Sequence, residues 1–290
     1  MNILVTGSNG QLGSEIKDLA ASYKNFNFFF SVLPALDISN RNQLDVFFTE
    51  NKINTVINCA AYTAVDKAEE DEIIAKKVNS EGVLNLVNAV AKVNGKLIHI
   101  STDYVFDGNS FLPYQESDEV NPIGVYGNTK RSGELAVINA NIDGIVIRTS
   151  WLYSAYGNNF VKTMLRLGGE REELGVIFDQ VGTPTSASDL AKTCLDILSY
   201  NEEAKINGKG KLYHFSNEGV ASWYDFAVAI MEFGKVDCQV KPIQTKDYPT
   251  LAKRPHFSVL NKTKIKTDFE IEIPYWRDAL VSCINKLENK

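Results

Sequence analysis

Three glycines near the start of the chain constrain its fold more than any other feature. Gly7, Gly10 and Gly13 follow the apolar run Ile3–Thr6 and open a segment of helical period, Gln11–Ser22. Glycines at this spacing permit a tight turn from strand to helix and let a pyrophosphate approach the backbone at the helix N-terminus. A turn with a purely structural role is the alternative, but the position directly after the first strand favours a dinucleotide-binding loop.

Short β-rich runs alternate with helical segments through the first half of the chain. The expected strands are Ile3–Thr6, Phe28–Val32, Thr55–Cys59, Leu97–Ser101 and Ile145–Arg148, and the expected helices are Gln11–Ser22, Asn42–Asn51, Val65–Val93 and Gly124–Ala140. This alternation predicts βαβ units, and strands that are apolar almost throughout predict a parallel sheet covered on both faces. With the glycine loop, the sequence predicts an α/β fold of the Rossmann type, a doubly wound parallel sheet, with residues 1–150 as the NAD(P)-binding domain.

The spacing of the expected elements changes after Trp151. Helices are expected at Asn158–Leu167, Ser188–Leu198, Ser222–Phe233 and Trp276–Leu287, and strands at Gly175–Phe178, Leu212–Phe215 and Val240–Gln244. Ser188 and Ser222 are candidate N-caps for two of these helices. This half has no glycine loop of its own, and no shift in composition marks a linker. We therefore expect residues 151–290 to form mainly a smaller α/β substrate-binding lobe that interleaves with the first domain.

Charge and hydropathy exclude several classes of partner. The 290 residues include 36 acidic and 30 basic side chains, a net charge of −6, so we expect no nucleic-acid partner. The longest apolar run, Phe28–Leu36, is too short to span a membrane, and Met1 leads into a strand rather than a secretion signal. The four cysteines and three histidines are dispersed and show no metal-binding spacing. We expect a soluble, cytoplasmic protein without a bound metal.

The end of the second expected strand bears on the choice of nicotinamide cofactor. An acid there binds the ribose 2′-OH of NAD and repels the 2′-phosphate of NADP. The run Phe28–Ser31 has no acid, so NADPH is the expected cofactor, and it has no arginine, so NADH stays open. Asp37 and Ile38 follow closely and are expected to lie near the adenosine.

A tyrosine and a lysine four residues apart are the strongest indication of chemistry. Tyr126 and Lys130 lie on the same side of the expected helix Gly124–Ala140. A free tyrosine has a pKa of ~10, and a neighbouring ammonium group lowers that pKa because it favours the phenolate. Tyr126 would then donate a proton to a carbonyl oxygen while hydride arrives from the nicotinamide, and Lys130 would bind the nicotinamide ribose. On an isolated helix the same spacing is usually a surface pair.

A hydroxyl group after the fourth expected strand favours an active site over a surface pair for Tyr126 and Lys130. The run Ser101–Tyr104 ends that strand, at the carboxyl edge where open α/β sheets bind ligands. Thr102 can there orient the substrate carbonyl and support proton transfer. The glycine loop, Thr102 and the pair of Tyr126 and Lys130 together predict a nicotinamide-dependent active site.

Motifs along nearly the whole chain resemble the extended short-chain dehydrogenase/reductase family. They are, in order, Gly10–Gly13 (GQLG), Ala60–Glu69 (AAYTAVDKAE), Ser101–Gly108 (STDYVFDG), Tyr126–Lys130 (YGNTK), Arg148–Trp151 (RTSW), Gly157–Phe160 (GNNF), Asp179–Thr185 (DQVGTPT) and Arg254-Pro255. Within the family, the likeness is strongest to reductases of nucleotide-linked keto-sugars. It implies reduction of the 4-keto group of a dTDP-linked 6-deoxy-L-hexulose by NADPH.

The resemblance also implies roles for individual residues. Tyr126 is the implied proton donor, Lys130 its partner and Thr102 the hydroxyl that tunes it. The implied substrate contacts are Thr102, Asp103, Trp151 and, toward the nucleotide phosphates, Arg254. Trp151 as a core aromatic and Arg254 as an ordinary surface residue are the alternatives. The implied cofactor-binding residues are Gly7, Gly10, Gln11, Leu12, Gly13, Asp37, Ile38, Ala60, Ala61, Tyr62, Thr63, Tyr126 and Lys130.

Some relatives form a dimer in which magnesium bridges acidic side chains. Glu15 is present here, but Ser188 stands where a second acid is expected, with Asp189 beside it. Because magnesium takes several oxygen ligands, we expect no metal bridge and interpret Glu15 as a solvated residue of the first helix. A homodimer without a metal stays open.

Two other functions fit parts of the pattern. The first is another family member acting on a nucleotide sugar: an epimerase, a dehydratase or a reductase of a different keto-sugar. A dehydratase usually needs an acidic pair after the threonine, whereas Asp103 is here followed by Tyr104. The second is a non-catalytic regulatory subunit of a methionine adenosyltransferase, a role in which relatives serve. The combination of Thr102, Tyr126 and Lys130 favours an enzyme.

Overall fold

The computed structural model describes residues 1–203 and 210–289, and in these residues six parallel strands form one central sheet. Across the sheet their order is β2 (Asn27–Ser31), β1 (Asn2–Thr6), β3 (Thr55–Asn58), β4 (Lys96–Thr102), β5 (Asp143–Thr149) and β10 (Lys211–His214). The chain leaves β1 toward one edge of the sheet and β3 toward the other, so their carboxyl ends form the switch point at which such sheets bind ligands. The predicted α/β fold of the Rossmann type is confirmed.

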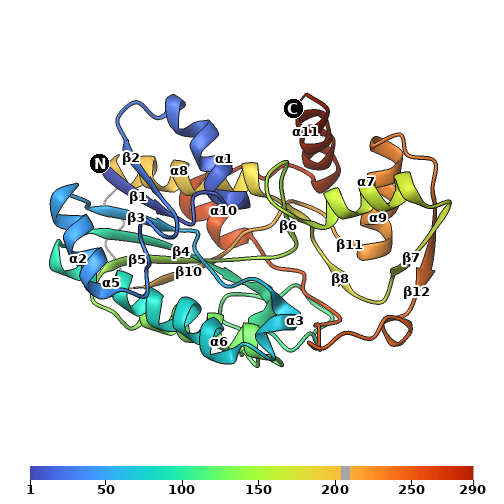
Figure 1. Ribbon diagram of the computed structural model, residues 1–290, viewed down its shortest axis with the longest axis horizontal. Helices are drawn as coiled ribbons and strands as arrows, with labels where there is room; N and C mark the ends of the chain where they lie inside the picture. The colour runs from blue at the N-terminus through green and yellow to red at the C-terminus, as the bar shows by residue number, and fades with distance from the viewer. Residues whose placement is uncertain (204–209, 290) are drawn as a thin grey trace.

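Helices cover both faces of this sheet, as Figure 1 shows. One layer contains α1 (Gln11–Leu19), α8 (Ala187–Glu203) and α10 (Thr263–Phe269), and the other contains α2 (Arg41–Glu50), α5 (Val83–Lys92) and α6 (Val125–Ile138). Strand β1 shows why its residues are apolar almost throughout: Ile3 and Val5 pack against the first layer, and Leu4 packs against the second. Successive side chains of a strand point to opposite faces, so a sheet covered twice needs apolar residues at every position.

The single long helix expected at Val65–Val93 is instead four shorter segments. They are α3 (Val65–Ala68), α4 (Glu72–Lys76), the π-helical η2 (Lys77–Gly82) and α5. The buried Asn79 of η2 accepts a hydrogen bond from the backbone N–H of Tyr62 at 2.9 Å and donates one to the Tyr62 carbonyl at 3.1 Å. π-Helical turns are often found at functional sites, and this one fixes the loop that follows β3.

A smaller lobe at the right of Figure 1 is built from residues after Trp151. Within the described residues it contains the strand pairs β6 (Leu152–Tyr153) with β9 (Thr185–Ser186), β8 (Val181–Gly182) with β11 (Ala221–Ser222), and β7 (Glu173–Ile177) with β12 (Gln239–Ile243). Its helices are α7 (Phe160–Glu170), α9 (Trp223–Phe233) and α11 (Trp276–Glu288), and together they enclose a separate apolar core. The remaining elements are the short 3₁₀ turns η1 (Ala20–Ser22), η3 (Asp103–Val105) and η4 (Thr245–Asp247).

The second half of the chain contributes to both parts of the molecule. Strand β10 joins the edge of the main sheet beside β5, and α8 packs against α1. Ser222 caps α9 as expected, in a capping box with Asp225. Helix α8 begins at Ala187, so Ser188 lies inside its first turn and is not its cap, contrary to expectation. Among the described residues, no helix has both the length and the apolar character that a membrane span requires.

Candidate active site

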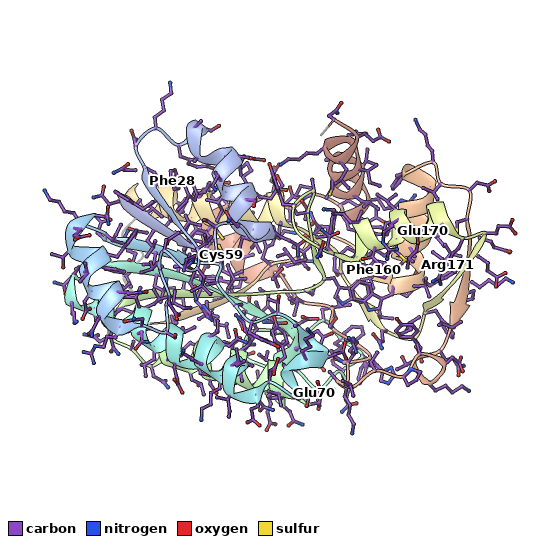
Figure 2. All side chains as sticks on the ribbon, viewed as in Figure 1. Phe28, Cys59, Glu70, Phe160, Glu170 and Arg171 are labelled. Carbon is purple, nitrogen blue, oxygen red and sulfur yellow. The ribbon has the colours of Figure 1, made fainter. Side chains whose placement is uncertain are left out.

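A cleft of about 1080 Å³ opens where the carboxyl ends of β1, β3, β4 and β5 meet the lobe. Figure 2 labels Cys59, directly after β3, near the middle of the molecule. The described residues that line the cleft include nearly every predicted site residue: Gly7, Gly10, Gln11, Leu12, Gly13, Asp37, Ile38, Ala60, Ala61, Tyr62, Thr63, Thr102, Asp103, Tyr126, Lys130 and Trp151. Arg254 is the exception. The sheet thus brings together residues that lie up to about half the chain apart in sequence.

The glycine loop makes the tight turn that the predicted dinucleotide site needs, because two of its positions have no room for a side chain against the neighbouring backbone. Gly7 has φ +59°, and a Cβ there would lie 2.8 Å from the backbone of Ala60. A Cβ on Gly13 would lie 2.5 Å from Ser8 Cα. Gly10 precedes the first turn of α1, whose N–H groups have no acceptor within the helix and are therefore free to bind a phosphate.

The lobe contacts the same loop from the other side, through Gly157 and Asn159, for which no individual role was expected. The Asn159 side-chain amide donates hydrogen bonds to Gln11 Oε1 at 3.0 Å and to the Ser154 carbonyl at 2.7 Å. Gly157 has φ +64° and lies so close to Gln11 that a Cβ on Gly157 would be 3.1 Å from Gln11 Cγ. Both residues belong to the GNNF motif, which was therefore the available signal for this part of the cleft.

Thr102, Asp103 and Tyr126 form the polar centre of the cleft. The Thr102 hydroxyl donates a hydrogen bond to Asp103 Oδ1 at 3.0 Å and accepts one from the Tyr104 backbone at 3.2 Å. The ring of Tyr104 meets that of Tyr126 edge to face, with 5.5 Å between centroids. Burial raises the pKa of Tyr126 to about 12; the Thr102 hydroxyl acts against this rise and the Asp103 carboxyl adds to it. Tyr126 is therefore a neutral phenol with a proton to donate.

Lys130 lies one helical turn beyond Tyr126 but acts differently from the expectation. Its ammonium donates a hydrogen bond to the Ile100 carbonyl at 2.6 Å. Burial lowers the pKa of Lys130 to about 8, while the nearby Glu134 and Cys59 raise it. The sequence-based expectation that this ammonium lowers the pKa of Tyr126 is wrong for the structure, because burial dominates at both groups.

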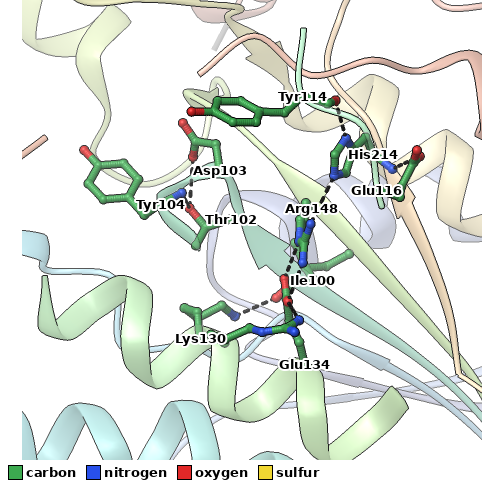
Figure 3. A network of polar contacts seen from close by, with 11 residues as sticks. Ile100, Thr102, Asp103, Tyr104, Tyr114, Glu116, Lys130, Glu134, Arg148 and His214 are labelled. Carbon is green, nitrogen blue, oxygen red and sulfur yellow. Dashed lines mark hydrogen bonds and ion pairs between the residues drawn. The ribbon is translucent and has the colours of Figure 1, made fainter. Parts of the chain in front are cut away.

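A buried ion pair lies directly behind Lys130 (Figure 3). Arg148 Nε and Nη2 donate to the two oxygens of Glu134 at 2.7 and 2.9 Å, and both side chains are fully buried. Arg131 contacts the same carboxylate at 2.8 Å, and Arg148 Nη1 lies 3.4 Å from His214 Nε2. The pair ties α6, which carries Tyr126 and Lys130, to the end of β5.

Comparisons with known proteins agree with this geometry. The family model described as "RmlD substrate binding domain" matches residues 1–289. The dTDP-4-dehydrorhamnose reductase of Aggregatibacter actinomycetemcomitans is 41% identical to this chain, over 96% of each. This chain belongs to the dTDP-4-dehydrorhamnose reductase family.

Solved structures of the family superpose closely on this chain. The dTDP-4-dehydrorhamnose reductase of Clostridium acetobutylicum has a TM-score of 0.93 and 43% identity, covering 99% of this chain and 100% of that one. The enzyme from Bacillus anthracis, solved in complex with NADP, has a TM-score of 0.92 and 35% identity, covering 98% and 99%. The fold is therefore that of the dTDP-4-dehydrorhamnose reductase family.

Trp151 lines the cleft and also packs against an aromatic group of the lobe. Its indole stacks on that of Trp223, with 3.7 Å between ring centroids and 9° between planes. Its backbone has φ +48°, in the left-handed region, which costs a non-glycine residue roughly 1–3 kcal/mol. The Trp151 side chain can therefore pack against the lobe and still contact a substrate in the cleft, so the two interpretations do not exclude each other.

Arg254 is not among the described residues that line the cleft and is paired with an acid. Its Nη2 and Nη1 contact the two oxygens of Asp66 at 2.6 and 3.2 Å, and Asp66 also accepts a hydrogen bond from the Ala252 backbone at 3.1 Å. The hydrogen bond from Arg254 is the main cause of the lowered pKa of Asp66, against a smaller opposing effect of burial. A contact of Arg254 with substrate phosphates stays a prediction.

Glu15 is not the solvated residue that the sequence indicated. It is 2% exposed, accepts a hydrogen bond from Ser154 at 2.5 Å and pairs with Lys286 of α11 at 2.6 Å. The same ammonium contacts Asp18 at 2.7 Å. Asp189 accepts a hydrogen bond from the Asn217 side chain at 2.7 Å. Over residues 1–203 and 210–289, no group of three or more acidic, histidine or cysteine side chains is arranged to hold a metal ion.

The buried carboxyl of Asp103 predicts an unusual dependence of stability on pH. Burial raises its pKa from 3.8 to about 6, although hydrogen bonds from Thr102 and Ser258 act in the opposite direction. Because the folded pKa exceeds the unfolded one, this group stabilises the fold at acidic pH, and the effect is lost as pH rises through about 6.

Urea titrations of wild type and Asp103→Asn between pH 4 and 7.5 measure this effect. We expect the unfolding free energy of wild type to fall relative to the variant across this range, by up to about 3 kcal/mol. Other carboxyl groups contribute equally to both proteins and cancel in the difference. Two profiles that run parallel would show that Asp103 has an ordinary pKa.

Proposed function

We propose that this chain uses NADPH to reduce the 4-keto group of dTDP-4-dehydro-L-rhamnose, which gives dTDP-L-rhamnose. The observation that carries the proposal is the meeting of Thr102, Tyr126 and Lys130 in one cleft beside the glycine loop. The family to which the chain belongs is named for this reaction. An oxidoreductase of nucleotide-sugar biosynthesis accounts for the nucleotide-binding loop and for the proton donor together.

The cofactor-binding part of the proposal rests on the shape of the cleft. Gly7 and Gly13 permit the tight turn from β1 into α1, and Gln11 and Leu12 begin the helix at which the pyrophosphate would bind. Ser31, at the end of β2, stands where an acid would repel a 2′-phosphate, so NADPH is accepted. The related enzyme from Bacillus anthracis was solved with NADP, which supports the same choice.

The chain's own residues would handle the proton that the reduction requires. When bound, the nicotinamide supplies a hydride to the carbonyl carbon. The Tyr126 phenol, neutral because its pKa is raised to about 12, donates its proton to the carbonyl oxygen as negative charge develops there. The Thr102 hydroxyl acts against the rise in the pKa of Tyr126. Lys130, whose pKa is lowered to about 8, donates a hydrogen bond to the Ile100 carbonyl one helical turn beyond Tyr126 and would bind the nicotinamide ribose.

The residue after Asp103 separates this reaction from dehydration. A dehydratase needs a second acid next to the first, and here Tyr104 lies against the ring of Tyr126 instead. With one carboxyl group at the centre of the cleft, the site has a donor for the keto oxygen and lacks the acidic pair for elimination of water.

An absorbance assay tests the proposed function directly. The keto-sugar is generated in situ from dTDP-glucose by the preceding enzymes of the pathway, and NADPH or NADH oxidation is followed at equal concentrations. We expect oxidation that depends on the keto-sugar, with dTDP-L-rhamnose formed in equal amount and NADPH used at least as well as NADH. Cofactor binding without turnover would overturn the proposal, and co-purification of a stoichiometric larger partner would then favour the regulatory alternative.

A further inference from the structure

The stacked pair of Trp151 and Trp223 joins the active-site cleft to the lobe. Trp151 is among the described residues that line the cleft, whereas Trp223 is not. At 3.7 Å between centroids and 9° between planes, Trp223 covers one face of the Trp151 indole. Trp223 is therefore placed to control the orientation of Trp151 without touching a ligand itself.

The surroundings of Trp151 leave its indole little freedom. Its backbone φ of +48° departs from the extended conformation of β5 immediately before it. On the lobe side, a Cβ on Gly182 would lie 2.8 Å from Trp151 Cε2, so only glycine permits this approach. The Trp151 carbonyl accepts a hydrogen bond from the Thr185 backbone at 3.1 Å. A non-glycine residue keeps a left-handed backbone conformation only where its neighbours fix its position. Such residues are concentrated at functional sites.

Trp223 is itself held firmly within the lobe. It is the first residue of α9, directly after the N-cap Ser222 and within the capping box that Ser222 forms with Asp225. Its ring lies 4.7 Å from that of Phe160 and 6.4 Å from that of Phe226, both on the lobe side of the molecule. Figure 2 shows Phe160 at the start of α7, well away from Cys59 and the centre of the sheet. The position of the indole is thus set by the lobe core and not by the nucleotide-binding half.

From this arrangement we propose that Trp223 is a positioning residue for the substrate: it fixes Trp151 as an apolar wall against the sugar ring. The inference rests on the proposed function, because it takes the substrate to be a 6-deoxy sugar. Such a sugar presents a methyl group and C–H faces, which a flat, immobile aromatic surface binds well because little ordering remains to be done on binding. The lobe would thereby select the sugar, while the glycine loop binds the cofactor.

The test compares Trp223→Leu and Trp223→Phe with the control Trp276→Phe. Trp276 is a buried core residue of the same lobe, with its ring 5.9 Å from that of Phe226. We expect Trp223→Leu to raise the KM for the keto-sugar about 10–100-fold, with a smaller change in kcat and no change in NADPH affinity. Trp223→Phe should recover most of the loss, and Trp276→Phe should resemble wild type.

A spectroscopic measurement checks that the two indoles are stacked in solution. Stacked indoles couple in circular dichroism, so wild type and Trp276→Phe should show an exciton couplet that both Trp223 variants lack. A lost couplet with an unchanged KM in Trp223→Leu would overturn the inference while leaving the proposed function intact. A wild-type protein that binds NADPH but does not reduce the keto-sugar would overturn the proposed function, and this inference with it.

Discussion

Replacement of Tyr126 by phenylalanine is expected to lower kcat about 10²–10⁴-fold while NADPH binding stays intact. The ring remains, so its edge-to-face contact with Tyr104 is kept, and only the hydroxyl that donates the proton is removed. Without that hydroxyl, another group such as a water molecule would have to donate the proton. The measurement is steady-state turnover with a saturating keto-sugar, alongside fluorescence titration with NADPH.

The matched control for this experiment is Tyr104→Phe. Tyr104 also lines the cleft and touches the same aromatic ring, but its backbone rather than its hydroxyl binds Thr102. We expect its kcat to stay within about tenfold of wild type, since no proton transfer is assigned to it. A comparable loss in both variants would show that the aromatic packing matters and that Tyr126 is not the specific acid.

The parts of the fold that the sequence predicts are those encoded by local pattern. The strands of the first half are recognisable because both faces of the sheet are buried, as Ile3, Leu4 and Val5 illustrate. The break in the helical segment that begins at Val65 escapes such a pattern, because it depends on Asn79, which turns inward to bind the backbone of Tyr62 across 17 residues. Helix α10 was not predicted, since its seven residues are too short for a clear period.

The candidate site also contains residues that could be predicted from the sequence and residues that could not. Residues that follow strand ends, such as Gly7, Ala60 and Thr102, could be predicted because parallel strands deliver their carboxyl ends to one edge. Trp223 carries no comparable signal, because only the folded lobe brings its indole onto that of Trp151. The pKa of Tyr126 was predicted in the wrong direction because the spacing of charges can be read from a sequence, whereas the degree of burial cannot.

The largest expected effect on stability comes from Arg148, whose replacement by alanine should lower the free energy of unfolding by about 3–5 kcal/mol. Glu134 would keep its place in the interior, and of its two ion pairs in the described part of the chain only the one with the partly exposed Arg131 would remain. Burial alone raises the pKa of Glu134, and the hydrogen bonds and charge of Arg148 more than reverse this, so the pKa is lowered in the folded protein. Urea unfolding at neutral pH measures the loss.

An exposed arginine–glutamate pair in the same chain provides the control. Arg166 and Glu170 lie 2.9 Å apart on α7, with 60% and 53% of their side chains exposed, so Arg166→Ala should cost less than about 1 kcal/mol. The Arg148 effect should also depend on pH. Because the folded pKa of Glu134 is lowered, the pair stabilises the fold above the unfolded pKa and ceases to do so as pH falls through the folded one. The difference in unfolding free energy between wild type and Arg148→Ala should therefore become smaller at acidic pH. If this difference stays constant with pH, lost packing and not lost charge pairing is the cause.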